Sequence, residues 1–201
     1  MAAADAGAVR RVRRNTQRRR MHIREAQVTD APAIAQVHID TWRTTYKGLV
    51  PDAYLASLSY EQRTSFWQSR LSESNSPWFV YVAEDNDQHV IGFASGGPER
   101  TQDTVYTGEL VAIYLLAAHQ RQGVGRQLTA AIAQRLIQQG HRSMLVWVLA
   151  ANPSRLFYAS LGGQLIRERA INLDGIDLAE VAYGWRDLHA LANTLLSAPA
   201  L

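Results

Sequence analysis

Residues 120–126, with the sequence QRQGVGR, combine features that could bind a phosphate group. Gly123 and Gly125 stand directly before a stretch with helical periodicity, so consecutive main-chain N–H groups are expected at a helix N-terminus. That end of a helix attracts anions, because its first N–H groups lack partners and the helix dipole is positive there. Two glycines before a helix also occur in ordinary tight turns. No Gly-Lys-Ser/Thr follows and no third glycine completes a dinucleotide fingerprint, so ATP and NAD are disfavoured.

The elements that must position this segment alternate between strand and helix periods, as in an α/β or α+β domain with one layered sheet. Strand patterns cover residues 22–27, 79–84, 90–96, 105–116 and 143–149, and two final strands flank Asp174-Gly175. Helical patterns cover residues 29–42, 51–71, 123–139 and 153–161, and the residues beyond about 188 are expected to be helical and peripheral. The inward face of the first helix carries Ile34, Val37, His38, Thr41 and Trp42. The glycine segment therefore joins a strand to a helix.

Composition indicates one globular domain. The chain has 201 residues, of which 47% are apolar and 19% charged, and no run approaches the roughly 18 apolar residues of a membrane-spanning helix. Cysteine is absent, which excludes disulfides and thiolate nucleophiles and fits a reducing, cytoplasmic location. The six histidines show no metal-ligand spacing, each is expected to be a surface or loop residue in preference to a ligand, and no metal is predicted.

The positive charge is concentrated at the N-terminus. Residues 1–20 carry seven arginines against Asp5, a net charge of +6, whereas the whole chain carries +3. The remaining residues are therefore acidic overall. We expect residues 1–20 to be a disordered extension, with Met21 as an alternative start, because so few apolar residues cannot offset the entropy of ordering. An arm that touches RNA, DNA or a membrane is the alternative. No secretory signal is expected, although the composition leaves a transit peptide open.

The strand, the glycine segment and two neighbouring motifs together resemble the GNAT N-acetyltransferase superfamily. Its signature, Gln/Arg-x-x-Gly-x-Gly/Ala, is met by Gln120, Gly123 and Gly125, and Glu109 stands eleven residues earlier, where many members keep a general base. Residues 152–158 with Leu161-Gly162-Gly163 resemble the second cofactor motif. The resemblance covers residues 21–188 and leaves 189–201 as a peripheral tail. Trp42, Tyr46, Gly48, Pro51 and Tyr54 look like a bacterial branch of unassigned substrate.

Two departures from the family pattern affect these motifs. Ala117-Ala118 stands where proline and a polar residue are frequent, and one residue fewer than usual separates Asn152 from Tyr158. The second departure weakens the assignment of Asn152 to the cofactor.

The resemblance implies a single domain with a mixed, mostly antiparallel sheet of about seven strands and helices on both faces. The sheet would be splayed between the strand ending near Leu116 and the one beginning near Ser143, with acetyl-coenzyme A in the split. Pantetheine amides would pair with main-chain groups, and the pyrophosphate with the amides of residues 121–126. The implied cofactor-binding residues are Ile113, Tyr114, Leu115, Gln120, Arg121, Gln122, Gly123, Val124, Gly125, Arg126 and Asn152.

The reaction implied is direct acetyl transfer to an amine, which must lose a proton to attack the thioester. Glu109 is the candidate base, acting directly or through water; its alternative is a structural carboxylate bonded to backbone. Tyr158 is the candidate acid for the departing thiolate, or a hydrogen-bond donor to its sulfur; its alternative is a core aromatic. An N–H near Leu115 would polarise the carbonyl. Without cysteine or an evident Ser-His pair, an acyl-enzyme is disfavoured.

The acceptor implied is a primary amine of a small metabolite, an antibiotic or a protein N-terminus. Trp42, Tyr46 and Trp147 are the candidate substrate-binding residues, with Trp67 as a further aromatic, although such residues also fill cores. Glu99, Arg100 and Asp103 lie in a loop where acceptor contacts or plain solvation both fit. A homodimer is left open, and no membrane partner is expected. The rival function is a catalytically silent acyl-coenzyme A sensor or interaction domain, which the arginine tail could associate with nucleic acid. For the primary function no nucleic-acid partner is expected.

Overall fold

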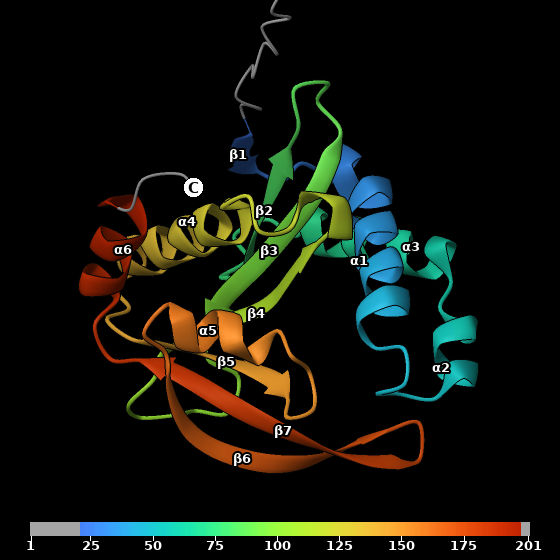
Figure 1. The fold of residues 1–201 in the computed structure, drawn as a ribbon. Coiled ribbons are helices and arrows are strands. Elements are labelled where there is room, and N and C mark those ends of the chain that lie inside the picture. The colour runs from blue at the N-terminus through green and yellow to red at the C-terminus, as the bar shows by residue number, and fades with distance from the viewer. Residues whose placement is uncertain (1–20, 198–201) are drawn as a thin grey trace, which may run out of the picture.

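The computed structural model describes residues 21–197, which form one seven-stranded sheet with helices on both faces (Figure 1). The predictions for residues 1–20 and for the last four residues lie outside this range. The strands are β1 (His22–Glu25), β2 (Phe79–Glu84), β3 (Val90–Pro98), β4 (Gly108–Leu115), β5 (Met144–Leu149), β6 (Gln164–Leu173) and β7 (Ile176–Trp185). Their order in the sheet is β1-β2-β3-β4-β5-β7-β6, and only β4 and β5 pair in parallel. The mixed, mostly antiparallel sheet expected from the sequence is confirmed.

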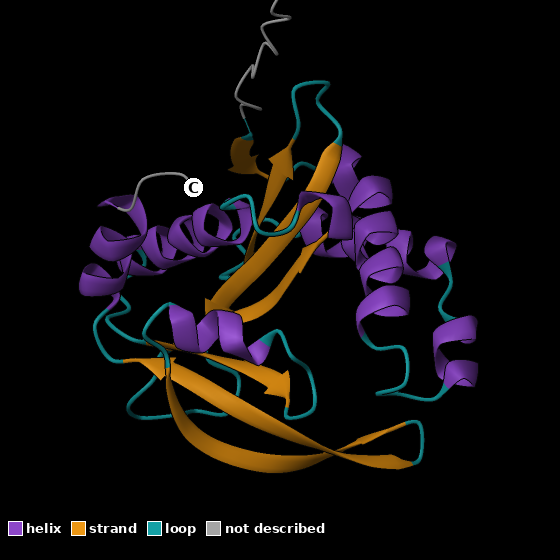
Figure 2. Cartoon of the chain, in the orientation of Figure 1, coloured by secondary structure: helices purple, strands orange, loops and turns teal. Residues whose placement is uncertain are grey.

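Helices cover the sheet in two layers (Figure 2). They are α1 (Ala31–Thr45), α2 (Asp52–Ser57), α3 (Tyr60–Ser72), α4 (Val124–Gln138), α5 (Arg155–Ser160) and α6 (Leu188–Ser197), with 3-10 turns at Val28–Asp30 and Ala117–His119. One apolar cluster joins α4, α5 and α6 to the sheet, and a second joins α1 and α3 to its opposite face. The alternation of buried side chains along β4 and β5 therefore decides which groups face each layer.

The sheet separates between its two parallel strands. β4 and β5 pair only at Gly108 with Met144 and at Glu109 with Leu145, and beyond these pairs the strands diverge. A β-bulge interrupts the β3–β4 register between Ser95 and Gly96. Bulges bend a strand and increase its twist, which fits the divergence of β4 from β5. The expected split thus opens directly after Glu109.

Two element boundaries in the structure differ from those predicted from the sequence. The helical pattern over 51–71 is two helices, because Leu58 is extended and the Ser59 hydroxyl accepts the Gln62 N–H to begin α3. Residues 105–107 lie in the loop before β4, since the Asp103 carboxylate accepts the N–H groups of Val105 and Tyr106.

The segment beyond residue 188 is helical as expected, but it packs against the core, whereas a peripheral tail was expected. In α6, Leu188, Leu191 and Leu195 are buried in the same apolar cluster as α4. The packed body therefore extends beyond residue 188. Within residues 21–197, no helix has the length and apolar character needed to cross a bilayer.

Candidate active site

The segment between β4 and α4 presents a row of free main-chain donors. Among residues 21–197, no acceptor takes the N–H groups of residues 121–126, and the first N–H bonded back into the helix is that of Gln127, to the Gly123 carbonyl at 3.1 Å. Arg121 has φ 58° and Gly123 has φ 84°, so left-handed residues turn the chain here. Successive N–H groups in such a turn form a concave surface that suits an anion.

Side chains of this segment brace the turn. The Gln120 amide donates to the Leu115 carbonyl at 3.1 Å, and the Gln122 amide donates to the Ala118 carbonyl at 2.9 Å. The Arg126 guanidinium donates to the Thr194 carbonyl of α6 at 3.2 Å. Val124 is fully buried in the core. These contacts leave the main-chain N–H groups of the segment available to a ligand.

Gly125 brings α5 close to this turn. A Cβ added at Gly125 would lie 3.2 Å from the Phe157 ring, so a larger residue would press against α5. Phe157 is half-buried and packs on the main core. Asn152 lies in the loop between β5 and α5. It is buried, and its Oδ1 accepts the Ser154 N–H at 2.8 Å. Asn152 thus shapes the entry to α5.

The free edge of β4 faces the split. The Leu116 N–H donates to the Ile91 carbonyl of β3, and N–H groups alternate in direction along an extended strand. Ile113 and Leu115 therefore direct their main-chain groups away from β3, toward the gap between β4 and β5. The Tyr114 side chain packs on the α1 face, with its ring 5.5 Å from that of Phe93.

Glu109 lies at the vertex of the split, and only 1% of its surface is exposed. Leu110 packs on the α4 face, so the neighbouring Glu109 side chain faces the α1 layer. Its Oε2 accepts the Arg100 Nε–H at 2.9 Å and the Arg100 main-chain N–H at 3.3 Å, and its Oε1 accepts Arg100 Nη2–H at 2.5 Å. The hydrogen bonds to Glu109 raise the pKa of Arg100. The two side chains therefore form a two-pronged ion pair.

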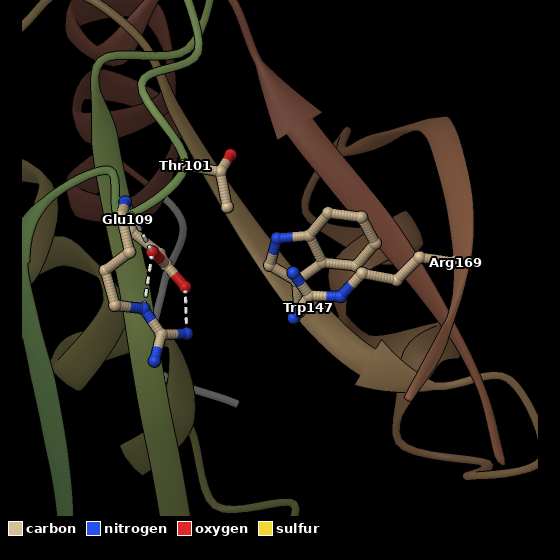
Figure 3. A pocket seen from close by; sticks show the side chains of 5 residues that line it. Thr101, Glu109, Trp147 and Arg169 are labelled. Atoms are coloured by element: carbon tan, nitrogen blue, oxygen red, sulfur yellow. Dashed lines mark hydrogen bonds and ion pairs between the residues drawn. The ribbon is translucent and has the colours of Figure 1, made fainter. Parts of the chain in front are cut away.

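A pocket of about 200 Å³ adjoins this ion pair, lined by Arg100, Thr101, Glu109, Trp147 and Arg169. Figure 3 shows Glu109 on one wall and Trp147 with Arg169 on the other. The Arg169 guanidinium lies over the Trp147 ring, 3.9 Å from its centroid, and its Nε and Nη2 donate to Glu180 at 3.0 and 2.8 Å. Glu109 and Trp147, which were singled out separately in the sequence, thus share one pocket.

Tyr158 is buried in α5 on the same side of the sheet as α4. Its ring lies 5.5 Å from that of Phe157 and 6.2 Å from that of Tyr183. Burial raises the pKa of Tyr158, and neighbouring Tyr46 adds to the increase. The hydroxyl is therefore protonated at neutral pH and is chemically able to donate a proton.

The end of α1 contributes an aromatic group beside the split. The Trp42 and Tyr46 rings are 4.5 Å apart, and they pack with Tyr54 and with Leu149 at the end of β5. Burial raises the pKa of Tyr46, while nearby polar groups of Tyr114 and Asn152 oppose the increase. Tyr46 therefore links α1 to the segments that carry Tyr114 and Tyr158.

His38 is a core residue and not a surface or loop histidine. It is only 8% exposed, and its ring is surrounded by those of Trp42, Trp67, Phe93 and Tyr114. Burial lowers its pKa to about 3, and Arg63 acts in the same direction. The helical periodicity, which put His38 on the inward face of α1, carried the correct signal. Trp67 belongs to the same core.

A separate group of possible metal ligands lies in the turn between β2 and β3. Atoms of Asp85, Asp87 and His89 lie within 4.8 Å of one another, although histidine spacing gave no sign of them. The Asp85 carboxylate already accepts the N–H groups of Asp87 at 3.0 Å and His89 at 2.9 Å. This arrangement is explained as a turn held by Asp85.

This fold, with its open β4 edge and free N–H groups, defines a class of acyl-transferring enzymes. Comparisons with known proteins support the same class. Residues 98–171 match the family described as FR47-like protein. The chain is 45% identical over 173 residues to the uncharacterized N-acetyltransferase YuaI of Bacillus subtilis, which covers 86% of this chain and 97% of that protein. The chain therefore belongs to the GNAT N-acetyltransferase superfamily and is an acyltransferase.

Solved structures share the fold at lower identity. An N-acetyltransferase from Staphylococcus aureus Mu50 superposes with a TM-score of 0.66 and 21% identity, covering 84% of this chain and 99% of that one. YncA of Salmonella typhimurium, a putative acetyltransferase solved with acetyl-CoA, gives 0.63 and 23%, covering 84% and 94%. These likenesses establish the architecture.

Proposed function

We propose that this protein transfers the acetyl group of acetyl-CoA to a primary amine by direct attack within a ternary complex. The observation that carries the proposal is the row of free N–H groups at residues 121–126, adjoining a sheet that opens between β4 and β5. The Salmonella neighbour, which shares this architecture, was solved with acetyl-CoA.

The donor would bind mainly to the main chain. Its pyrophosphate sits on the N–H groups of residues 121–126, where the helix dipole favours negative charge. Its pantetheine amides pair with main-chain groups on the free edge of β4, with those of Ile113 as the candidates, as an added strand would. Asn152 supports this site indirectly, because its amide oxygen holds the loop that leads into α5.

Proton removal from the amine is assigned to Glu109, acting through an intervening water. Glu109 is almost fully buried and Arg100 bonds to both of its oxygens, so direct contact with the amine is obstructed. A carboxylate oxygen can accept about two hydrogen bonds, and Oε1 receives one from Arg100. Oε1 therefore retains a site for water.

Tyr158 donates its proton to the sulfur that leaves when the carbon–sulfur bond breaks. Its raised pKa keeps the hydroxyl protonated at neutral pH and makes it a weaker acid than a free tyrosine, so the proton moves only as negative charge develops on the sulfur. A free N–H of β4, with that of Leu115 as the candidate, polarises the thioester carbonyl. The amine attacks that carbonyl carbon, forming the amide and releasing coenzyme A as a thiol.

The acceptor approaches from the α1 side of the sheet. Trp42 and Tyr46 border this side at the end of α1, and Trp147 lies in the Glu109 pocket. A small metabolite, an antibiotic and a protein N-terminus remain the candidate acceptor classes.

The test is to incubate the protein with acetyl-CoA and a panel of primary amines and to measure released thiol, with acetyl-CoA affinity measured by calorimetry. Binding together with amine-dependent thiol release is expected. Absence of acetyl-CoA binding would contradict the proposal. Binding without thiol release across a broad panel would favour the silent acyl-CoA sensor.

A further inference from the structure

The two ion pairs that border the Glu109 pocket present their positive ends to the outside. The Arg100 side chain is 48% exposed while its partner Glu109 is 1% exposed, and Arg169 is 36% exposed while Glu180 is 16% exposed. In both pairs the carboxylate is the covered member. A molecule that enters this pocket therefore meets guanidinium groups before it meets either carboxylate.

Both guanidinium groups also have N–H donors that are not used in these ion pairs. Arg100 uses Nε and Nη2 on Glu109, and Arg169 uses Nε and Nη2 on Glu180. Within the described part of the chain, the Nη1 atom of neither arginine donates to an acceptor. Each Nη1 carries two N–H groups, so the two Nη1 atoms of the arginines that line or border this pocket hold four charged donors that no described residue accepts.

These donors are held in position before any ligand binds. Arg100 is fixed by its two-pronged bond to Glu109, and Arg169 is fixed by Glu180 and by the Trp147 ring beneath it. Figure 3 shows Glu109 and Arg169 on opposite walls of the pocket. A planar carboxylate suits such guanidinium donors in both charge and geometry, and little side-chain entropy would be lost on binding.

We propose that the acceptor is an amine that carries a neighbouring carboxylate, as an α-amino acid does, and that Arg100 and Arg169 bind its acid group. This rests on the proposed function, because Glu109 serves there as the base beside the same pocket. With the acid group held at the pocket, the attached amine is kept near Glu109 and the vertex of the split. Arg169 is then a specificity-determining residue, and Arg100 has two roles, since it also holds Glu109.

The experiment compares α-amino acids with the amines that lack only the carboxylate, such as phenylalanine with phenethylamine and leucine with 3-methylbutylamine. We expect kcat/KM to be about ten- to a hundredfold higher for the acids, the range of a charged hydrogen bond. Arg169→Gln should remove this preference while acetyl-CoA affinity stays unchanged. Arg169→Lys, which keeps the charge but not the planar fork, should retain part of it.

Arg186→Gln is the control, because Arg186 is exposed and lies outside the pocket lining. It should leave the preference intact. Denaturation curves of all three variants would show whether Arg169→Gln has lost its fold, and in that case the Lys variant decides. Equal or better acetylation of the carboxylate-free amines would overturn the inference.

A binding measurement separates this inference from the proposed function. Calorimetry of N-acetylphenylalanine and N-acetylphenethylamine, with and without coenzyme A, needs no turnover. Tighter binding of the acid would support the inference even if no amine is acetylated. Equal binding of the two compounds would overturn it even if acetyl transfer is demonstrated.

Discussion

Tyr158 combines burial with a hydroxyl group beside other tyrosines of the split, and its role can be isolated by removing one oxygen atom. For Tyr158→Phe we expect kcat to fall by about 100-fold, as for loss of a general acid, while acetyl-CoA affinity changes little. Steady-state kinetics on a verified acceptor measure kcat, and calorimetry measures the affinity for acetyl-CoA. Tyr183→Phe, in the neighbouring buried tyrosine, is the matched control. Unchanged kcat in Tyr158→Phe would remove this residue from the mechanism.

His38 makes stability depend on pH. Its pKa is 6.5 in an unfolded chain and about 3 in the fold, so between these values the unfolded state binds more protons. The contribution of His38 is fully present above pH 6.5 and is lost as pH falls toward 3. Between pH 7 and pH 5, this residue alone should lower the free energy of unfolding by about 2 kcal/mol.

Urea denaturation at the two pH values checks this expectation. His38→Leu, in a site lined by aromatic rings, should make the free energy of unfolding nearly equal at pH 7 and pH 5. His89→Gln, on the exposed turn between β2 and β3, should keep the wild-type difference. An unaltered difference in His38→Leu would assign the pH dependence to other groups.

At the scale of elements, glycines at the two ends of α4 allow a controlled test of the proposed pyrophosphate site at residues 121–126. Gly123 has φ 84° at the start and Gly140 has φ 89° just after the end, and an added Cβ meets nothing within 4 Å at either place. Alanine should therefore cost about 1 kcal/mol of stability at both positions, through backbone strain alone. Only Gly123→Ala should also weaken acetyl-CoA binding, by about tenfold, because the strained turn redirects its N–H groups.

Calorimetry and denaturation of both variants separate the two effects. Equal acetyl-CoA affinity in Gly123→Ala and Gly140→Ala would contradict the assignment of the pyrophosphate to this turn.

The last helix provides a second pair of matched positions. Leu195 is 7% exposed against α4, and the adjacent Leu196 is 60% exposed. Leu195→Ala should lower the free energy of unfolding by about 2–4 kcal/mol, whereas Leu196→Ala should change it by less than about 0.5 kcal/mol. Chemical denaturation measures both. Similar small effects would mean that α6 is the peripheral segment that its sequence suggested.

The order of strands and helices was largely readable from the sequence, because periodicity reports which side of an element is buried. Element boundaries failed where one polar side chain overrides that pattern. Asp103 holds residues 105–107 in a loop, so the strand predicted from residue 105 begins only at residue 108. Ser59 divides the helical pattern over 51–71 into two helices. Both signals are visible in hindsight as residues that cap turns and helices.

The chemistry of the pocket was less readable. Glu109 and Trp147 were identified singly, but the ion pair with Arg100 depends on a loop that folds back over nine residues. The stacking of Arg169 on Trp147 crosses from β6 to β5 over β7, a contact that no local pattern encodes. Such pairs follow from the sheet order, which the family resemblance implied only in outline.

At the scale of the whole molecule, the reaction should need both substrates at once. The chain contains no cysteine that could hold an acetyl group, and the proposed donor site and acceptor pocket open into one split. Initial velocities measured against both substrates should therefore give intersecting lines in double-reciprocal plots. Parallel lines, or a protein mass increased by one acetyl group, would instead indicate an acyl-enzyme.

The ladder between β4 and β5, where the two halves of the sheet meet, has two residue pairs, those of Gly108 with Met144 and Glu109 with Leu145. Under the proposed function, a cofactor lying along β4 fills the place of a missing strand, so part of the cohesion of the fold is supplied by a metabolite. Binding to the folded state alone raises stability with ligand concentration. The lifetime of this protein against proteolysis would then follow the size of the cell's coenzyme pool.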